Sequence, residues 1–364
     1  MLKNAWTLFT NILTGCNIAG VLLMWGCAAS VYVTPAGMGA AWPLLGLVFP
    51  FFIVVNLLFC IVWLFISRRR LLIPLIGFAG CYGTLRTYCP VNLPSPHPKG
   101  CIKVLSYNTL FFGQNAIDKA GDNAVAAYIR DSRADIVCLQ EAGYGWAEMQ
   151  ERLLPLLSPE YPYFVRNDVG TESNNTVACF SRYPILSARP LLYESRSNGS
   201  YLYAILLAPG DTVWVINNHL ESNRLSADDR ERYKELIKKT EEAQLKKDSR
   251  MLASKVGHAG QVRAAQADSI AALINRHPER SFIVCGDFND TPISYTRYAI
   301  ARNLTDTYRA TGNGPGFSFN RDGILVRIDH LLCTPDWEPY ECRVDRSIKA
   351  SDHYPIACYL KRKK

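Results

Sequence analysis

Apolar residues follow two different patterns along the chain. Within residues 1–90 they form three long runs, at 12–33, 42–67 and 71–87, and the second run is almost uninterrupted. A helix rises about 1.5 Å per residue, so runs of this length match the roughly 30 Å hydrocarbon core of a bilayer. The pattern predicts a membrane anchor of about three transmembrane helices in residues 1–90.

From residue 101 onward the apolar residues form short runs instead, which are typical of buried strands. The runs lie at 101–108, 135–141, 175–182, 204–209, 212–220, 281–289, 327–333 and 355–360. Helical periodicity fills some of the gaps, for example at 123–131 and 261–276. The pattern predicts one large α/β domain over 101–364, with sheets that are covered on both faces.

Two segments interrupt this organisation. Residues 91–100 are rich in proline and predict an extended linker that holds the domain away from the bilayer. Residues 221–258 are charged and favour helix, and they follow a predicted strand directly. We interpret them as a helical insertion, which is either a solvated helix with paired charges or a lid over a site.

The charges divide at the same place as the apolar pattern. Residues 1–99 hold six Lys or Arg and no Asp or Glu, whereas the residues beyond 99 sum to +2 of the total net charge of +8. Without the last four residues, that part sums to −2. A dedicated nucleic-acid binder usually carries a basic surplus, so the composition does not favour that class.

Lys and Arg in short loops predict the orientation of the anchor. The sequence SRRR at 67–70 lies between the second and third runs, and Lys3 precedes the first run, so we expect both on the cytoplasmic side. Three spans then place the domain outside the cytoplasm, at what we expect to be a bacterial inner membrane. If the third run, which contains Arg86, does not span, the orientation inverts. The alternative of a cleaved signal peptide fits poorly, because the apolar runs are too long and recur.

The twelve cysteines do not predict a disulfide framework. Five lie in or beside the first three apolar runs, and most of the others lie inside predicted strands. We interpret them as small buried hydrophobic residues, and only the pairing of Cys333 with Cys342 stays open.

Polar residues of a catalytic type stand at the ends of several predicted strands. They are Asn108, Glu141, His219, Asp287, Asn289, Asp329, Asp352 and His353. Each has an ordinary explanation when taken alone, such as a turn at Asn108 or a carboxylate at a helix N-terminus for Glu141. Because the ends of neighbouring strands converge, the set as a whole predicts one site. Its carboxylate and amide oxygens suit Mg²⁺ or Mn²⁺, and no Cys or His cluster indicates zinc.

The order and local context of these residues resemble the endonuclease/exonuclease/phosphatase superfamily. The matching motifs are SYNTL, LQE, NNHL, GDFN, RIDHLL and SDHYPI, and together they extend over about 101–360. The resemblance implies a DNase I-like fold, a four-layer α/β sandwich of two mixed β-sheets flanked by helices. It also implies hydrolysis of a phosphoester with the help of Mg²⁺ or Mn²⁺.

The resemblance implies a metal site and a set of catalytic groups. Glu141 is expected to be the principal metal ligand, with Asn108 beside it and Asp352 in support.

Asp287, oriented by Asn289, is expected to activate the attacking water. His353 is expected to contact the scissile phosphate, with its tautomer and charge set by Asp329. His219 is expected to stabilise charge on the phosphoryl oxygens.

These motifs recognise only phosphate and metal, so the substrate stays open. The charge balance and the predicted anchor favour a lipid-linked or small phosphoester, such as a lipid headgroup, over duplex DNA. The alternative is a membrane-anchored endonuclease or exonuclease. A further hypothesis is an inactive membrane-anchored binding protein, but the sequence keeps every residue of the expected site.

Overall fold

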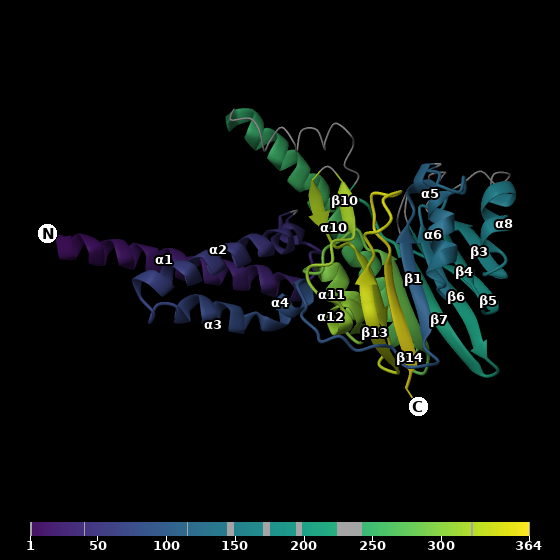
Figure 1. Cartoon of the computed structure of the whole chain (residues 1–364). Coiled ribbons are helices and arrows are strands. Elements are labelled where there is room, and N and C mark those ends of the chain that lie inside the picture. The colour runs from purple at the N-terminus through teal and green to yellow at the C-terminus, as the bar shows by residue number, and fades with distance from the viewer. Residues whose placement is uncertain are drawn as a thin grey trace.

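The chain forms a group of N-terminal helices followed by a sandwich of two β-sheets (Figure 1). The computed structural model describes residues 2–39, 41–114, 116–143, 149–169, 175–193, 199–223, 242–321 and 323–363.

The N-terminal helices project from one side of the sandwich. Helices α1 (Leu2–Ala29) and α2 (Leu45–Ile66) pack side by side, and α3 (Leu72–Gly80) packs against both of them. The short 3-10 helices η1 (Ser30–Tyr32) and η2 (Trp42–Leu44) lie at the ends of α1 and α2 that are nearest the sandwich.

Two of the described helical segments, Asn4–Tyr32 and Trp42–Ile66, are long and apolar enough to cross a membrane, although a signal sequence meets the same criterion. The third apolar run, predicted to span, is divided into α3 and α4 (Tyr82–Tyr88). The break occurs at Cys81, where φ is −120° and ψ is 24°. Neither of these two helices is long enough to span a bilayer by itself.

The first sheet has the strand order β13-β14-β1-β2-β4-β3. Its strands are β1 (Ile102–Asn108), β2 (Ile136–Gln140), β3 (Tyr163–Asp168), β4 (Thr176–Ser181), β13 (Trp337–Val344) and β14 (Ile356–Arg362). Strands β1 and β2 are parallel, and the other neighbours are antiparallel, so the sheet is mixed.

The second sheet has the order β5-β6-β7-β8-β12-β9. Its strands are β5 (Ile185–Leu191), β6 (Gly199–Ala208), β7 (Asp211–His219), β8 (Ser281–Asp287), β9 (Thr305–Asp306) and β12 (Asp329–Cys333). Strands β7 and β8 are parallel, and the others are antiparallel. A separate hairpin consists of β10 (Phe319–Arg321) and β11 (Ile324–Val326).

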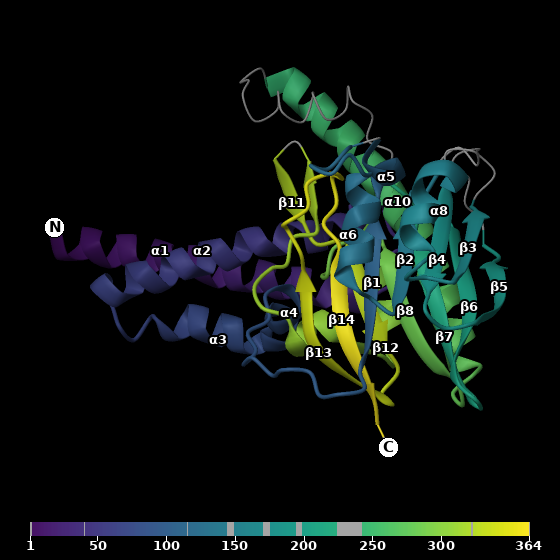
Figure 2. The same ribbon diagram turned by 45° about the vertical axis from the view of Figure 1, so that its right-hand side comes forward.

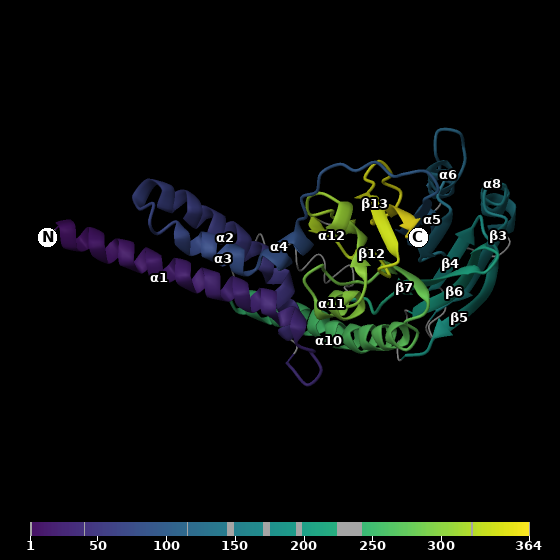
Figure 3. The ribbon, with the colours of Figure 1, turned by 90° about the horizontal axis from the view of Figure 1, so that it is seen from below.

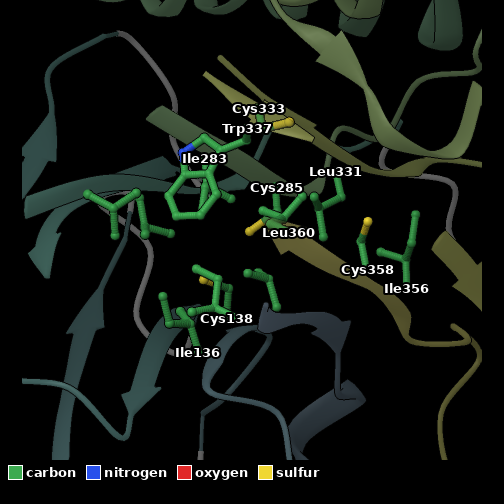
Figure 4. Close-up of a cluster of buried hydrophobic side chains, with 14 of the residues drawn as sticks. Ile136, Cys138, Ile283, Cys285, Leu331, Cys333, Trp337, Ile356, Cys358 and Leu360 are labelled. Atoms are coloured by element: carbon green, nitrogen blue, oxygen red, sulfur yellow. The ribbon is translucent and has the colours of Figure 1, made fainter. Parts of the chain in front are cut away.

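The inner faces of the two sheets meet in an apolar core (Figure 4). Cys138 of the first sheet and Cys285 of the second are both fully buried in it. All twelve cysteines are free, including the buried Cys333 and Cys342, so the pairing that the sequence left open is not formed.

Helices cover the outer face of each sheet, as the views in Figures 2 and 3 show. The helices α6 (Ala124–Ser132) and α8 (Leu154–Leu157) pack on the first sheet, and α10 (Glu242–Asn275) and α11 (Tyr295–Ala301) pack on the second. The short helices α5 (Leu110–Gln114) and α12 (Thr307–Thr311) complete the domain. This arrangement confirms the predicted four-layer α/β sandwich.

The N-terminal helices contact the sandwich directly. Ile293 of the sandwich shares a buried cluster with Met24 and Phe49 of the helices. A Cβ on Gly46 would lie only 1.6 Å from the carbonyl oxygen of Ile293, so this close approach requires glycine.

The proline-rich linker also packs on the domain. The side-chain amide of Asn92 donates to the carbonyl oxygens of Arg309 and Gly312, at 3.2 and 2.6 Å. The ring of His97 stacks on Tyr359, with centroids 3.7 Å apart. The linker therefore lies on the sandwich, and the helices before it contact the sandwich as well, so the linker does not separate these two parts of the chain.

The predicted insertion at 221–258 is described only in part, since residues 224–241 lie outside the described residues. Residues 242–258 are helical and form the first half of α10. This half of α10 projects beyond the sandwich (Figure 1), and its second half packs on the second sheet.

Candidate active site

Strand ends bring the predicted residues together at one edge of the sandwich. Asn108 ends β1, and Glu141 follows β2, which is the parallel neighbour of β1. In the other sheet His219 ends β7 and lies opposite Asp287 at the end of the parallel strand β8. Asp329 begins the antiparallel strand β12 and also lies opposite Asp287. The pairing register therefore brings these side chains together within each of the two sheets.

Asn108 joins the two sheets at this edge. Its buried side-chain amide donates to Glu141 Oε1 at 3.2 Å and to Asp287 Oδ2 at 3.1 Å. The other oxygen of Asp287 accepts a hydrogen bond from the backbone N–H of Asn289 at 2.8 Å. Burial raises the pKa of Asp287, and the charge of Asp329 adds to this effect, although His353 opposes it. Both carboxylate oxygens of Asp287 are thus held in fixed directions.

His353 forms an ion pair with Asp329. Its Nδ1 lies 2.8 Å from Asp329 Oδ2, and its Nε2 lies 3.7 Å from Asp287 Oδ2. Burial opposes protonation of His353, but the charges of Asp329 and Asp287 outweigh it and raise the pKa to about 10. The imidazole is therefore positively charged at neutral pH. The ring of Phe319 packs edge-on against it, with centroids 5.1 Å apart.

The pKa of His219 is shifted in the opposite direction from that of His353. Its Nε2 lies 3.8 Å from Asp287 Oδ2 and 3.9 Å from Glu141 Oε1, and its Nδ1 lies 3.1 Å from Asn175 Oδ1. Burial lowers the pKa of His219, so this histidine is neutral at neutral pH. The site thus combines one charged and one neutral imidazole.

The backbone around these residues adopts conformations that few side chains tolerate. Glu141 and Asn289 both lie in the left-handed region, with φ of 47° and 51°. Gly286 has φ of 128°, and a Cβ there would lie 2.0 Å from the carbonyl oxygen of Asn218. Glycine before Asp287 therefore allows β8 to approach β7 closely, next to the two strand ends that carry His219 and Asp287.

Two of the predicted residues contribute differently from the rest. The side-chain amide of Asn289 donates to the carbonyl oxygen of Leu220 at 2.9 Å, so Asn289 ties the end of β7 to β8. Asp352 accepts a hydrogen bond from Arg321 at 2.8 Å, which attaches the β10-β11 hairpin to the segment that carries His353. The side chains of six of the eight predicted residues contact one another at 3.9 Å or less. These are Asn108, Glu141, His219, Asp287, Asp329 and His353.

Several residues that position the site lie outside the set predicted from the sequence. Asn175 binds His219, and its position just before a buried strand next to β2 is the only signal in the sequence. Arg321 binds Asp352, and the Asp-Gly pair that follows it is a common hairpin sequence that indicates a turn there.

A layer of buried amides beneath the site was also missed. Gln140 donates to Asn217 Oδ1 at 2.6 Å, which links β2 of the first sheet to β7 of the second. Asn217 in turn donates to the carbonyl oxygens of Leu139 and Ala178, at 3.0 and 3.1 Å. These bonds fix the two sheets relative to each other directly below the strand ends.

The donor set fits a hard divalent cation such as Mg²⁺. The site offers oxygens from carboxylates, such as Glu141, and from the side-chain amide of Asn108, and Mg²⁺ prefers ligands of these kinds. Burial raises the pKa of Glu141, so its negative charge is not fully compensated within the protein. Asp329 Oδ1 is buried and has no hydrogen-bond partner in the described parts of the chain. One ligand atom from each of Asp287, Asp329 and His353 also lies within 4.8 Å of the other two.

The chain belongs to the endonuclease/exonuclease/phosphatase family, because the model of that family matches residues 105–353. Members of this family are hydrolases that act on phosphoesters, and they generally use a divalent metal. A second family model, for a domain of unknown function, matches residues 10–88. No curated protein matches the chain.

Solved structures of similar fold include TDP2 from D. rerio, crystallised with a single-strand DNA product. It is 15% identical, with a TM-score of 0.49, and the match covers 72% of this chain and 100% of that one. Sphingomyelinase C from Streptomyces griseocarneus is 15% identical, with a TM-score of 0.46 and coverage of 72% and 99%. The catalytic domain of human Nocturnin is 15% identical, with a TM-score of 0.49 and coverage of 75% and 96%.

Proposed function

We propose that this chain is a membrane-anchored, divalent-metal-dependent phosphoesterase whose favoured substrate is a lipid-linked or small phosphoester. The observation that carries the proposal is the buried polar network at the strand ends, in which Asn108 and Asp287 connect the two sheets. The network contains one charged and one neutral histidine, and it occurs in a member of a family of phosphoester hydrolases.

Glu141 and Asn108 would hold Mg²⁺ or Mn²⁺, with Asp352 in support from its position beside His353. The second candidate set of metal ligands is Asp287, Asp329 and His353. It is less suitable for a metal, because His353 Nδ1 is already bonded to Asp329 and the charged ring has no free lone pair. When bound, the cation would stabilise the negative charge that develops on the phosphoryl oxygens.

Asp287 is the proposed general base. Asn108 and the backbone of Asn289 each occupy one of its oxygens, so the carboxylate is held in one orientation toward an attacking water. Because burial raises its pKa, Asp287 accepts a proton more readily than an exposed aspartate, as a general base requires.

The two histidines have separate proposed roles. The charged ring of His353, held by Asp329, attracts the negative phosphate before the reaction. His219 donates from Nδ1 to Asn175, so in the neutral form its Nε2 carries no proton. The negative charge of a bound phosphate favours protonation of Nε2, which then becomes a donor to a phosphoryl oxygen.

The membrane setting supports a lipid-linked or small substrate. Two helices are apolar enough to span a bilayer, and their ends contact the sandwich directly, which keeps the active site close to lipid headgroups. The residues beyond 99 carry a net charge of only +2, which gives little general attraction for a polyanion such as DNA.

We test this function with the full chain in lipid nanodiscs at fixed salt. The substrates are plasmid DNA, single-stranded RNA, a sphingomyelin-like phosphodiester, phosphatidylinositol phosphates and soluble phosphomonoesters. We expect turnover of a lipid or a small ester with Mg²⁺ or Mn²⁺ and none with excess chelator. We also expect Asp287→Asn to lower the rate about a hundredfold or more, because the base is removed.

The matched control is Asp131→Asn, since the side chain of Asp131 is 66% exposed and lies on the surface helix α6. It should leave the rate unchanged. Full activity in chelator would contradict the mechanism. Rapid cleavage of DNA without turnover of lipid or small esters, abolished by Asp287→Asn, would instead identify an anchored nuclease.

The proposed topology has three passes, with α3 and α4 together forming the third, and it places the sandwich on the extracytoplasmic side of a bacterial inner membrane. The cytoplasmic loop would then contain Arg68, Arg69 and Arg70. Protease added to intact spheroplasts should digest the sandwich. Digestion that requires lysis of the cells would show that the chain makes an even number of passes.

A further inference from the structure

A cavity of about 280 Å³ lies where the N-terminal helices meet the sandwich. Its walls come from η1 and α4 on the helical side, and from α11, β9 and α12 on the sandwich side. None of the predicted active-site residues lines it. The volume is small for a ligand site and suits a headgroup better than a whole lipid.

The charged groups that line the cavity are Arg297, Arg302, Arg309 and Asp306. The carboxylate of Asp306 is paired with Arg297, whose Nε lies 3.1 Å from its Oδ2, and it also accepts the backbone N–H of Arg309 at 3.0 Å. The exposed guanidinium groups of Arg302 and Arg309 have no hydrogen-bond or ion-pair partner within the described ranges. The cavity therefore presents two uncompensated positive charges.

The position of the cavity places it at the surface of a bilayer. As a helix of 28 residues, α1 is about 42 Å long, which exceeds the roughly 30 Å hydrocarbon core. The far ends of α1 and α2 point away from the sandwich (Figure 1), so the ends beside the cavity would lie in the headgroup layer. Tyr32 and Tyr298 pack edge to face there, with centroids 4.8 Å apart, and tyrosine is enriched at this depth.

We propose that this cavity binds the phosphate-bearing headgroup of an anionic membrane lipid. Arg302 and Arg309 supply guanidinium donors for the phosphate oxygens, a pairing that is stronger than a neutral hydrogen bond. Val31 and Ile293, also in the wall, offer apolar contact to the glycerol part of the lipid. The site rests on membrane insertion of the helices but not on the proposed hydrolytic reaction. A lipid bound there would contact both parts of the chain and fix the sandwich on the bilayer.

The plain alternative is that both arginines stabilise helix ends. Arg302 is the C-cap residue of α11, and Arg309 lies in the last turn of α12, where a cation interacts favourably with the helix dipole. This role requires neither the cavity nor a lipid, so the two explanations differ in what they predict for lipid binding.

The experiment measures the binding of short-chain phosphatidylglycerol to the full chain in phosphatidylcholine nanodiscs, with bound lipid counted by native mass spectrometry. The double variant Arg302→Gln with Arg309→Gln should weaken binding about tenfold or more. Ala301→Phe keeps both arginines but fills the cavity, and it should weaken binding to a similar extent. The rate on a soluble phosphoester should stay unchanged in both, which verifies that the sandwich is folded.

The matched control is Arg133→Gln with Arg189→Gln, which makes the same change in charge. Both arginines are exposed; Arg133 is the C-cap residue of α6 and Arg189 lies in β5, two elements on the side of the sandwich away from the N-terminal helices (Figure 1). This control should bind phosphatidylglycerol as the unmodified chain does. Unchanged binding in the Arg302 and Arg309 double variant would overturn the proposal. If the double variant loses phosphatidylglycerol binding and Ala301→Phe does not, the cavity is not the binding site. Competition by inorganic phosphate or glycerol phosphate at the same concentration as the lipid would overturn the assignment to a lipid.

Discussion

The helical region (residues 2–88) and the sandwich (residues 101–363) arrange their side chains in opposite ways. In the sandwich large apolar side chains such as Phe282 are fully buried. In the helical region Phe51 and Phe65 are 62% and 86% exposed, while Asn17 and Asn56 are fully buried. Apolar residues outside and polar residues inside are typical of helices surrounded by lipid. The two surfaces are thus suited to different solvents.

Both regions bury polar groups, but the groups differ in whether they have partners. In the helices, Asn17 donates to Asn56 at 3.1 Å and accepts from Trp63 at 2.8 Å. In the active site, Asp329 has a buried oxygen without a partner in the described ranges, and burial raises the pKa of Glu141. Paired buried groups stabilise a fold, whereas incompletely paired ones are suited to bind a ligand.

The largest expected effect is on catalysis, from His353. Replacing His353 with Gln removes the positive charge that faces Asp287 and the proposed phosphate. We expect the rate to fall about a hundredfold or more, because a charged donor aimed at phosphoryl oxygens is lost. The measurement is the turnover rate of a soluble phosphoester at saturating Mg²⁺.

His277→Gln is the matched control, since its side chain is 33% exposed and pairs only with the nearby Glu279 among the described residues. That variant should keep the full rate. A His353→Gln variant that retains most of its activity would show that the charged histidine serves the fold and not the chemistry.

Apolar runs in the sequence predicted the interior strands of both sheets and missed the edges. The strands that were missed in the two large sheets are β3, β5, β9 and β13, and each is an edge strand. Interior strands are covered on both faces, so nearly all their residues are apolar. Edge strands are partly exposed, and β5 and β13 contain Pro190 and Pro339, which interior strands exclude.

In the candidate site, too, some residues could be predicted from the sequence and others could not. Residues such as Glu141 and Asp287 directly follow or end an apolar run, so their type and position were visible locally. The amides beneath the site were not, because Gln140 and Asn217 are 77 residues apart and meet only when the two sheets pack. The contact of Gly46 with Ile293 likewise depends on how the helices dock, which no local pattern indicates.

A smaller effect is expected from His330, a buried histidine of the sandwich outside the proposed chemistry. Its Nε2 donates to the carbonyl oxygen of Asp290 at 3.1 Å, and its ring lies against Phe288. Burial, together with the charge of Arg327, lowers its pKa from 6.5 to about 4. The unfolded chain therefore binds more protons below pH 6.5, and stability falls as the pH drops from 6.5 toward 4.

From this shift we expect the free energy of unfolding to be about 2 kcal/mol lower at pH 5 than at pH 7 on account of His330 alone. His330→Gln keeps a donor for Asp290 but does not titrate, so its stability should depend less on pH by this amount. Denaturant unfolding of both proteins at the two pH values measures the difference. An identical pH dependence would mean that His330 does not control acid stability.

The smallest effect is expected in the helical region, from Asn56. Asn56→Leu removes the hydrogen bond from Asn17 and leaves one buried amide of Asn17 unpaired, which should lower the stability of the packed helices by about 1 kcal/mol. The rate of phosphoester hydrolysis should stay within about twofold, because no residue of the active site is touched.

The measurement for Asn56 is the thermal midpoint of the full chain in detergent, followed at the helical signal, with the hydrolysis rate determined on the same samples. Cys16→Leu is the control, since Cys16 is exposed on the same helix as Asn17. A lower midpoint for Asn56→Leu alone would confirm that the buried amides of this region stabilise it. A large loss of hydrolysis would instead show that helix packing controls the active site, and the contrast between the two regions would no longer hold.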